Sequence, residues 1–143
     1  MNVIRVIFDV NSFGITQRSL KILRDALIEN VNHKIAVVEV PTNDLCCGFF
    51  IFDWEWKRAT WTGDGFRPDR CGEGGAGYRS AEALFDLLGI KPLIWDEIKV
   101  DEFSLLPEKK IEAKLLEIAR KIAQELQDDE FQKPAEKDPE YIR

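Results

Sequence analysis

The chain has 143 residues, of which 45% are hydrophobic and 32% are charged, and these proportions are ordinary for one globular domain. Its formal net charge is −6, which argues against general binding to nucleic acids or to anionic membranes. No apolar run approaches the roughly 18 residues of a membrane span, and the first residues do not have the pattern of a signal peptide, so we expect a cytoplasmic protein.

Cysteine and histidine are too sparse to form a metal or disulfide framework. Cys46 and Cys47 are adjacent, Cys71 stands apart from them, and His33 is the single histidine. This spacing is not typical of a zinc site or of a secreted disulfide scaffold. We therefore expect reduced thiols and a surface position for His33, and no motif identifies a cofactor.

The first third of the chain predicts a strand, a helix and a second strand. Residues 2–10 alternate between apolar and polar side chains, as in a half-buried strand. A turn over residues 11–14 precedes a helix over 17–29, for which Thr16 can act as the N-cap. Residues 34–40 predict the next strand, which ends before the turn that begins at Pro41.

The rest of the chain predicts an aromatic hairpin followed by two further helices. The hairpin strands are rich in aromatic and β-branched residues and flank a charged turn that contains two tryptophans. An apolar stripe at helical spacing runs through the last helix, which begins near Pro107. The expected elements are strands at 47–53 and 59–62, a helix at about 79–88 that ends at Gly89, a short buried strand at 93–95, and the last helix.

These elements follow the order β-α-β-β-β-α-β-α, which predicts an α/β (α+β) fold. Long connections favour parallel neighbours and a hairpin gives an antiparallel pair, so we expect a mixed sheet of about five strands with three helices. The expected single globular domain covers residues 1–128. Residues 129–143 form an acidic, proline-containing tail, either mobile or docked through Phe131 and Tyr141.

Residues 63–77 are the most unusual segment, because they hold six of the nine glycines and lead into a predicted helix. Glycine tolerates backbone conformations that other residues avoid, and the N–H groups at a helix start attract anions. The sequence therefore predicts a binding site for an anionic, phosphate- or nucleotide-like small molecule. The residues expected to form it are Asp64, Arg67, Gly74, Gly75, Gly77, Tyr78, Arg79 and Asp96.

Part of this segment resembles a dinucleotide-binding fingerprint. Residues 72–77 match G-x-G-x-x-G, and Asp96 lies 19 residues after Gly77, where such folds place the acid that binds ribose. The residues before Gly72 contain a proline and three charges, whereas the fingerprint requires an apolar strand there. Tyr78 and Arg79 stand where a P-loop has lysine and serine or threonine, so the segment does not predict that motif.

Two other classes of function remain open from the sequence. Trp54 and Trp56 beside Lys57 and Arg58 could present a surface for a partner protein or for a second copy in a homodimer. The other class is a metal-dependent hydrolase that uses strand-end carboxylates. Its candidate ligands are Asp9, Asp64 and Asp96, and the D-x-N of Asp9 and Asn11 resembles the strand-end aspartate of PIN-type nucleases.

Overall fold

The computed structural model describes residues 1–30, 32–98 and 105–133. These residues form one mixed five-stranded sheet with three α-helices, which confirms the predicted fold class. In chain order the elements are β1 (Arg5–Ile7), η1 (Val10–Ser12), α1 (Thr16–Glu29), β2 (Ile35–Pro41), β3 (Cys47–Asp53), β4 (Arg58–Trp61), α2 (Gly72–Leu88), β5 (Leu93–Ile94), α3 (Glu108–Glu125) and η3 (Asp128–Glu130).

The sheet has the strand order β1-β4-β3-β2-β5. Its centre is an antiparallel meander of β2, β3 and β4, as expected for strands joined by short turns. β1 pairs in parallel with β4 at one edge, and β5 pairs in parallel with β2 at the other. The hairpin register that the sequence left open places Phe50 opposite Trp61 and Asp53 opposite Arg58.

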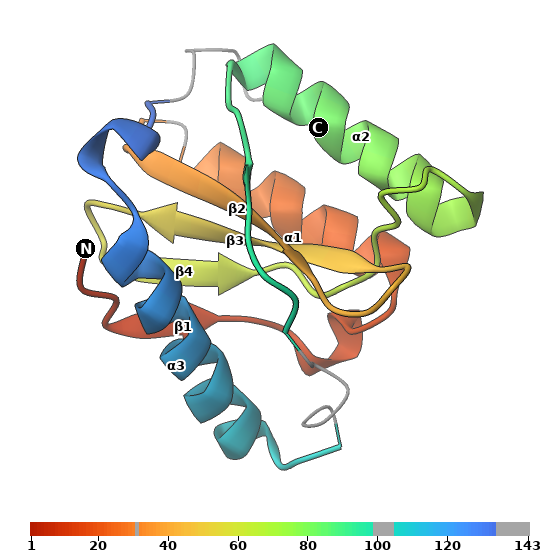
Figure 1. Ribbon diagram of the computed structural model, residues 1–143, viewed down its shortest axis with the longest axis horizontal. Helices are drawn as coiled ribbons and strands as arrows, with labels where there is room; N and C mark the ends of the chain where they lie inside the picture. Colours follow the sequence, from red (N-terminus) through yellow and green to blue (C-terminus); the bar gives the residue numbers. More distant parts are fainter. Residues whose placement is uncertain (31, 99–104, 134–143) are drawn as a thin grey trace.

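Helices cover both faces of this sheet (Figure 1). α1 and α2 lie together on one face and share a core with side chains of β2 and β3. α3 lies on the opposite face and packs on a second core, to which β1 and β4 also contribute. The molecule is therefore a three-layer sandwich with two separate apolar cores.

β3 lies between the two cores, which explains the apolar run from Cys47 to Phe52. All seven of its residues are buried. Phe49 and Ile51 face α1 and α2, whereas Phe50 and Phe52 face α3. Because neighbouring side chains of a strand point to opposite faces, a strand covered on both sides shows no alternation of polar and apolar residues.

The N-terminal strand and the first helix depart from the predicted bounds. β1 spans three residues instead of nine, because the chain turns at Asp9, whose carboxylate accepts the N–H of Asn11 at 2.9 Å and caps η1. Helix α1 begins at Thr16 after Ile15, so the prediction that Thr16 is the N-cap was wrong. The Thr16 hydroxyl instead donates a hydrogen bond to the carbonyl oxygen of Gly65 at 2.6 Å.

The predicted strand near residues 93–95 exists as β5, but it is not buried. The side chain of Leu93 is half-buried, and Ile94 is 74% exposed. Among residues 1–30, 32–98 and 105–133, β5 pairs with β2 alone and forms the edge of the sheet, which leaves its outer residue exposed. An apolar run of this length cannot by itself distinguish a buried strand from an edge strand.

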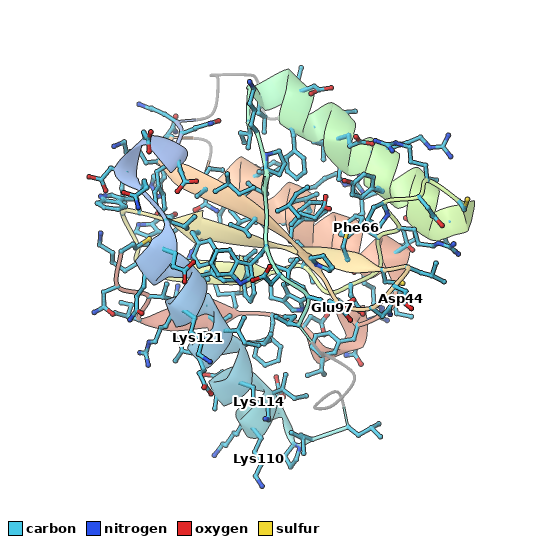
Figure 2. The ribbon with its side chains drawn as sticks, in the orientation of Figure 1. Asp44, Phe66, Glu97, Lys110, Lys114 and Lys121 are labelled. Atoms are coloured by element: carbon cyan, nitrogen blue, oxygen red, sulfur yellow. The ribbon has the colours of Figure 1, made fainter. Side chains whose placement is uncertain are left out.

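The apolar stripe of the last helix is confirmed. Ile111, Leu115 and Ile122 are buried against the sheet, and Glu117 forms the predicted ion pair with Lys121 at 3.7 Å. Figure 2 shows Lys110, Lys114 and Lys121 spread along the exposed side of α3. None of the helices in the described residues has the length and apolar character needed to cross a lipid bilayer.

The first residues after α3 dock onto the domain. Phe131 is buried, and its ring meets that of Trp54 edge to face with a centroid separation of 5.0 Å. The backbones of Gln132 and Ile35 exchange two hydrogen bonds, of 2.7 and 2.8 Å. Contact through Phe131 was one of the two predictions for the tail, whereas Tyr141 lies outside the described residues.

Candidate functional site

The glycine-dense segment packs closely against residues 12–16 at the start of α1, and we call this contact region the joint. A Cβ atom at Gly63 would lie 2.4 Å from the Ser12 hydroxyl oxygen, and one at Gly65 would lie 2.6 Å from backbone atoms of Ile15 and Thr16. These distances are well inside van der Waals contact. Packing of segments that are about 50 residues apart in the sequence therefore accounts for these two glycines.

Close approach also explains two glycines in the first turns of α2, one through a local contact and one through a contact with α1. The helix begins at Gly72, not near Arg79 as predicted, so Gly74, Gly75 and Gly77 are helical residues. A Cβ at Gly75 would lie 2.0 Å from the carbonyl carbon of Arg70, and one at Gly77 would lie 2.5 Å from Cγ2 of Thr16. Gly74 differs, because its nearest neighbour is the flexible side chain of Arg67.

Asp64 anchors this joint. Its carboxylate accepts the backbone N–H of Gly14 at 2.7 Å and the hydroxyl of Thr42 at 3.0 Å. The residue is buried, and these hydrogen bonds tie the loop before α1 to the loop after β2. Asp64 therefore has a structural role that its position in the sequence did not reveal.

Each of the three arginines near the start of α2 has an internal partner. Arg67 pairs with Asp69 at 2.6 Å, and this hydrogen bond lowers the pKa of the aspartate. Arg70 binds Glu82 through two hydrogen bonds of 2.6 and 3.1 Å. Arg79 donates to the carbonyl oxygen of Arg70 at 2.8 Å. The guanidinium groups thus already have acceptors before any ligand arrives.

Tyr78 of α2 contacts the sheet through a hydrogen bond to β2. Its hydroxyl donates a 2.5 Å hydrogen bond to Glu39, which is the single acid of β2 and is only 7% exposed. Burial raises the pKa of Tyr78, and the hydrogen bond and negative charge of Glu39 raise it further. The phenol therefore remains a proton donor at neutral pH, and the pair joins α2 to the sheet.

A pocket of about 320 Å³ opens beside this pair, between α2 and the edge formed by β2 and β5. Its size lies at the lower end of the range for small-molecule sites. One wall is polar, and the remaining walls are apolar and aromatic. The lining residues are Glu39, Phe49, Tyr78, Glu82, Phe85, Asp86, Ile90, Lys91, Pro92 and Ile94.

The polar wall follows from the spacing of residues on α2. Tyr78, Glu82 and Asp86 succeed one another at intervals of four, which places them on one side of a helix. Glu39 faces them from β2, and Lys91 is the single cation among the lining residues. Three carboxylates against one ammonium group make this a negatively charged pocket, with Glu82 also held by Arg70.

The apolar wall is an aromatic cluster beneath the pocket. Phe49 meets Phe85 edge to face at 5.2 Å and lies 6.2 Å from the nearly parallel ring of Tyr78. Phe66 packs edge to face on Phe49 at 5.1 Å and also lies close to Gly77 of α2. These contacts fix the position of α2 on the sheet and hence the shape of the pocket.

The predicted site residues therefore divide into separate groups. Tyr78 lines the pocket, whereas Asp64 and the packed glycines belong to the joint with α1. Asp96 is exposed beyond β5 and is not among the lining residues. Glu39 was not predicted, although a lone acid inside an apolar strand is a signal that could have identified it.

The three candidate metal ligands are not gathered into one site. Asp9 caps η1, Asp64 binds Gly14 and Thr42, and Asp96 is exposed. Within residues 1–30, 32–98 and 105–133, no group of three or more acidic, histidine or cysteine side chains could hold a metal ion.

Cys47 is buried beside Glu39, and this burial raises the pKa of its thiol.

The tryptophans of the hairpin face different environments. Trp61 is fully buried, Trp54 packs on Phe131, and Trp56 is 45% exposed. His33 was predicted to be a surface residue, but it is partly buried. Its Nδ1 lies 2.7 Å from Asp53, and its ring meets that of Trp56 edge to face. Self-association through this hairpin stays a prediction, for which the exposure of Trp56 provides a surface.

Comparisons with models of protein families, with curated proteins and with solved structures found no match to this chain. A function therefore has to be inferred from the geometry of the pocket and of the neighbouring surfaces.

Proposed function

We propose that the protein binds a small molecule with a positively charged group and an apolar body in the pocket beside α2. The observation that carries this proposal is the buried carboxylate of Glu39, which faces the pocket together with Glu82 and Asp86. A buried carboxylate is costly unless hydrogen bonds or an opposite charge compensate it. Tyr78 supplies one hydrogen bond, and an ammonium group of a ligand would supply the charge.

The apolar walls support the second part of the proposal. Phe49, Phe85 and Ile90 are buried in the core behind the pocket, and Pro92 and Ile94 complete its outer rim. Small-molecule sites commonly combine such walls with a few polar groups that orient the ligand. An arylalkyl amine would place its ring against the aromatic cluster and its ammonium group toward Glu39.

Calorimetric titration with three matched compounds tests this proposal. Phenethylamine, 2-phenylethanol and phenylacetate share an aromatic ring and differ in charge. We expect phenethylamine to bind about tenfold or more tightly than the neutral alcohol, because hydrogen bonds to charged groups contribute about 1.5–3 kcal/mol. Phenylacetate should bind most weakly of the three, since the pocket is negatively charged.

Glu39→Gln provides the variant for this titration. Glutamine keeps the shape and a carbonyl oxygen that can accept the hydroxyl of Tyr78, but it removes the charge. Glu73→Gln is the matched control, because Glu73 is exposed in the first turn of α2 and does not line the pocket. Equal affinity of wild type and Glu39→Gln for phenethylamine would argue against the proposal.

The second candidate is an anionic ligand at the start of α2, as the sequence predicts. The observations that favour it are the exposure of Gly72 and Glu73 at the start of α2 and the partial exposure of Arg67 and Arg70 beside it. Their ion pairs with Asp69 and Glu82 would have to be shared with the ligand or broken. Titration with inorganic phosphate tests this candidate, and loss of binding in Arg67→Gln would support it.

A further inference from the structure

A second surface pocket lies at the opposite edge of the sheet, where β1 pairs with β4. It has a volume of about 450 Å³ and is lined by Ile4, Arg5, Glu29, Trp56 and Arg58. Arg5 of β1 is paired with Arg58 of β4 in the parallel register, so the two side chains point to the same face of the sheet. The edge strand β1 thus brings two guanidinium groups together in a chain whose net charge is −6.

Arg58 is held in place but is not fully hydrogen-bonded. Its side chain is only 5% exposed, its Nη2 donates to Glu29 at 3.1 Å, and its guanidinium carbon lies 4.1 Å from the centre of the Trp56 ring. Its Nε is buried and has no hydrogen-bond acceptor among the described residues. Buried N–H groups are nearly always paired, and an unpaired one costs about 1–3 kcal/mol.

Arg5 contributes a second positive charge to the same pocket. Its side chain is exposed, and it has neither a hydrogen-bond nor an ion-pair partner within the part of the chain that the structure describes. Glu29 is the one carboxylate in the lining, and it is already paired with Arg58. Two guanidinium groups against one carboxylate leave a surplus of one positive charge.

The remaining lining is apolar and open to solvent. Ile4 is 61% exposed and Trp56 is 45% exposed, although both are large hydrophobic side chains. His33 supports the Trp56 ring edge to face at a centroid separation of 4.4 Å, so the indole is held in position. A positioned aromatic ring beside guanidinium groups suits a ligand that is both apolar and anionic.

We propose that the pocket formed by Ile4, Arg5, Trp56 and Arg58 binds an organic carboxylate with an apolar group. The carboxylate accepts hydrogen bonds from the exposed guanidinium group of Arg5 and lies beside the positive charge of Arg58, and the apolar group covers Trp56 and Ile4. This site is independent of the pocket beside α2, since it lies at the other edge of the sheet and selects the opposite charge.

Benzoate is the probe for this site, with benzamide as its neutral counterpart. We expect benzoate to bind saturably and Arg5→Gln to weaken it about fivefold or more. The benzoate affinity of Arg18→Gln should stay within about twofold of that of wild type. Arg18 is exposed in the first turn of α1, whereas Glu29, which lines the pocket, is the last residue of that helix. In nitrogen-15 spectra, benzoate should shift the Nε–H resonance of Arg58, a readout that needs no substitution of this buried residue.

Four results would overturn the proposal. The first is unchanged benzoate affinity in Arg5→Gln, and the second is equal affinity for benzoate and benzamide, which would deny a role to the charge. The third is a concentration-dependent dimer that dissociates in Trp56→Ala, which would assign the surface to a second copy of the chain. Inorganic phosphate should bind more weakly than benzoate, and equal binding would contradict the role of Trp56 and Ile4.

Discussion

Gly75→Ala tests whether close packing explains the glycine-dense segment. The new Cβ would lie 2.0 Å from the carbonyl carbon and 2.4 Å from the carbonyl oxygen of Arg70, both of which are backbone atoms. Overpacking of this kind costs about 1–3 kcal/mol, and more when backbone must move. Alanine regains up to about 1 kcal/mol of helix propensity, so we expect a net loss near 2 kcal/mol.

Gly74→Ala is the matched control, because it makes the same chemical change one residue earlier. Its Cβ would lie 2.8 Å from Cγ of the Arg67 side chain and 3.3 Å from the backbone oxygen of Gly65, so the displacement falls mainly on a side chain. We expect this variant to stay within about 1 kcal/mol of wild type, because the gain in helix propensity offsets this displacement. Urea unfolding followed by circular dichroism measures both variants, and Gly75→Ala should also lower Tm by about 4–8 °C. Equal stability of the two variants would refute the packing explanation.

Three further predictions concern the contacts that hold the fold. Phe131→Ala should lower the free energy of unfolding by about 3 kcal/mol in urea titrations, because it removes a buried ring from Trp54; a loss below about 1 kcal/mol would show that the segment after α3 is not docked. Asp64→Ala should cost about 1–3 kcal/mol in the same assay, because it removes the acceptor of the Gly14 N–H and of the Thr42 hydroxyl, and unchanged stability would contradict the anchoring role. The raised pKa of Tyr78 means that the folded state binds the phenol proton more tightly than the unfolded state. The stability from this group is therefore present below the unfolded pKa of about 10 and is lost as pH rises further. Denaturation at pH 9–11 should show a flatter decline in Tyr78→Phe than in wild type, and parallel declines would contradict this linkage.

The elements that sequence periodicity located well are those whose environment is uniform along their length. β2 and β3 read as apolar runs because helices cover them on both faces. The stripe of α3 is regular because one side of the helix packs on the sheet along its whole length. For such elements, local pattern and tertiary burial carry the same information.

The start of α2 was missed because tertiary packing overrides local propensity there. Glycine is a poor helix former, so four glycines among residues 72–77 indicated a loop. The structure needs small residues at Gly75 and Gly77, where Arg70 and Thr16 approach too closely for a side chain. Local sequence patterns cannot predict the contact between Gly77 and Thr16, because Thr16 is about 60 residues away in the sequence.

The pocket was missed for a related reason. Once α2 extends back to Gly72, Tyr78, Glu82 and Asp86 become a single polar stripe, which a helix beginning at Arg79 conceals. Glu39, which is 39 residues before Tyr78 in the sequence, lies beside this stripe and accepts the hydrogen bond from Tyr78. The sequence therefore located one member of the pocket without the partners that define its charge.

The most direct test of the proposed function is a nitrogen-15 NMR titration of the wild-type protein with phenethylamine. We expect saturable shifts in the amide resonances of Tyr78, Asp86 and Ile94, which surround the pocket. Glu39→Gln should reduce the shifts at equal amine concentration, whereas Glu73→Gln should not. Shifts confined to Gly72–Gly74, or shifts of equal size with phenylacetate, would contradict a negatively charged pocket that selects a cation.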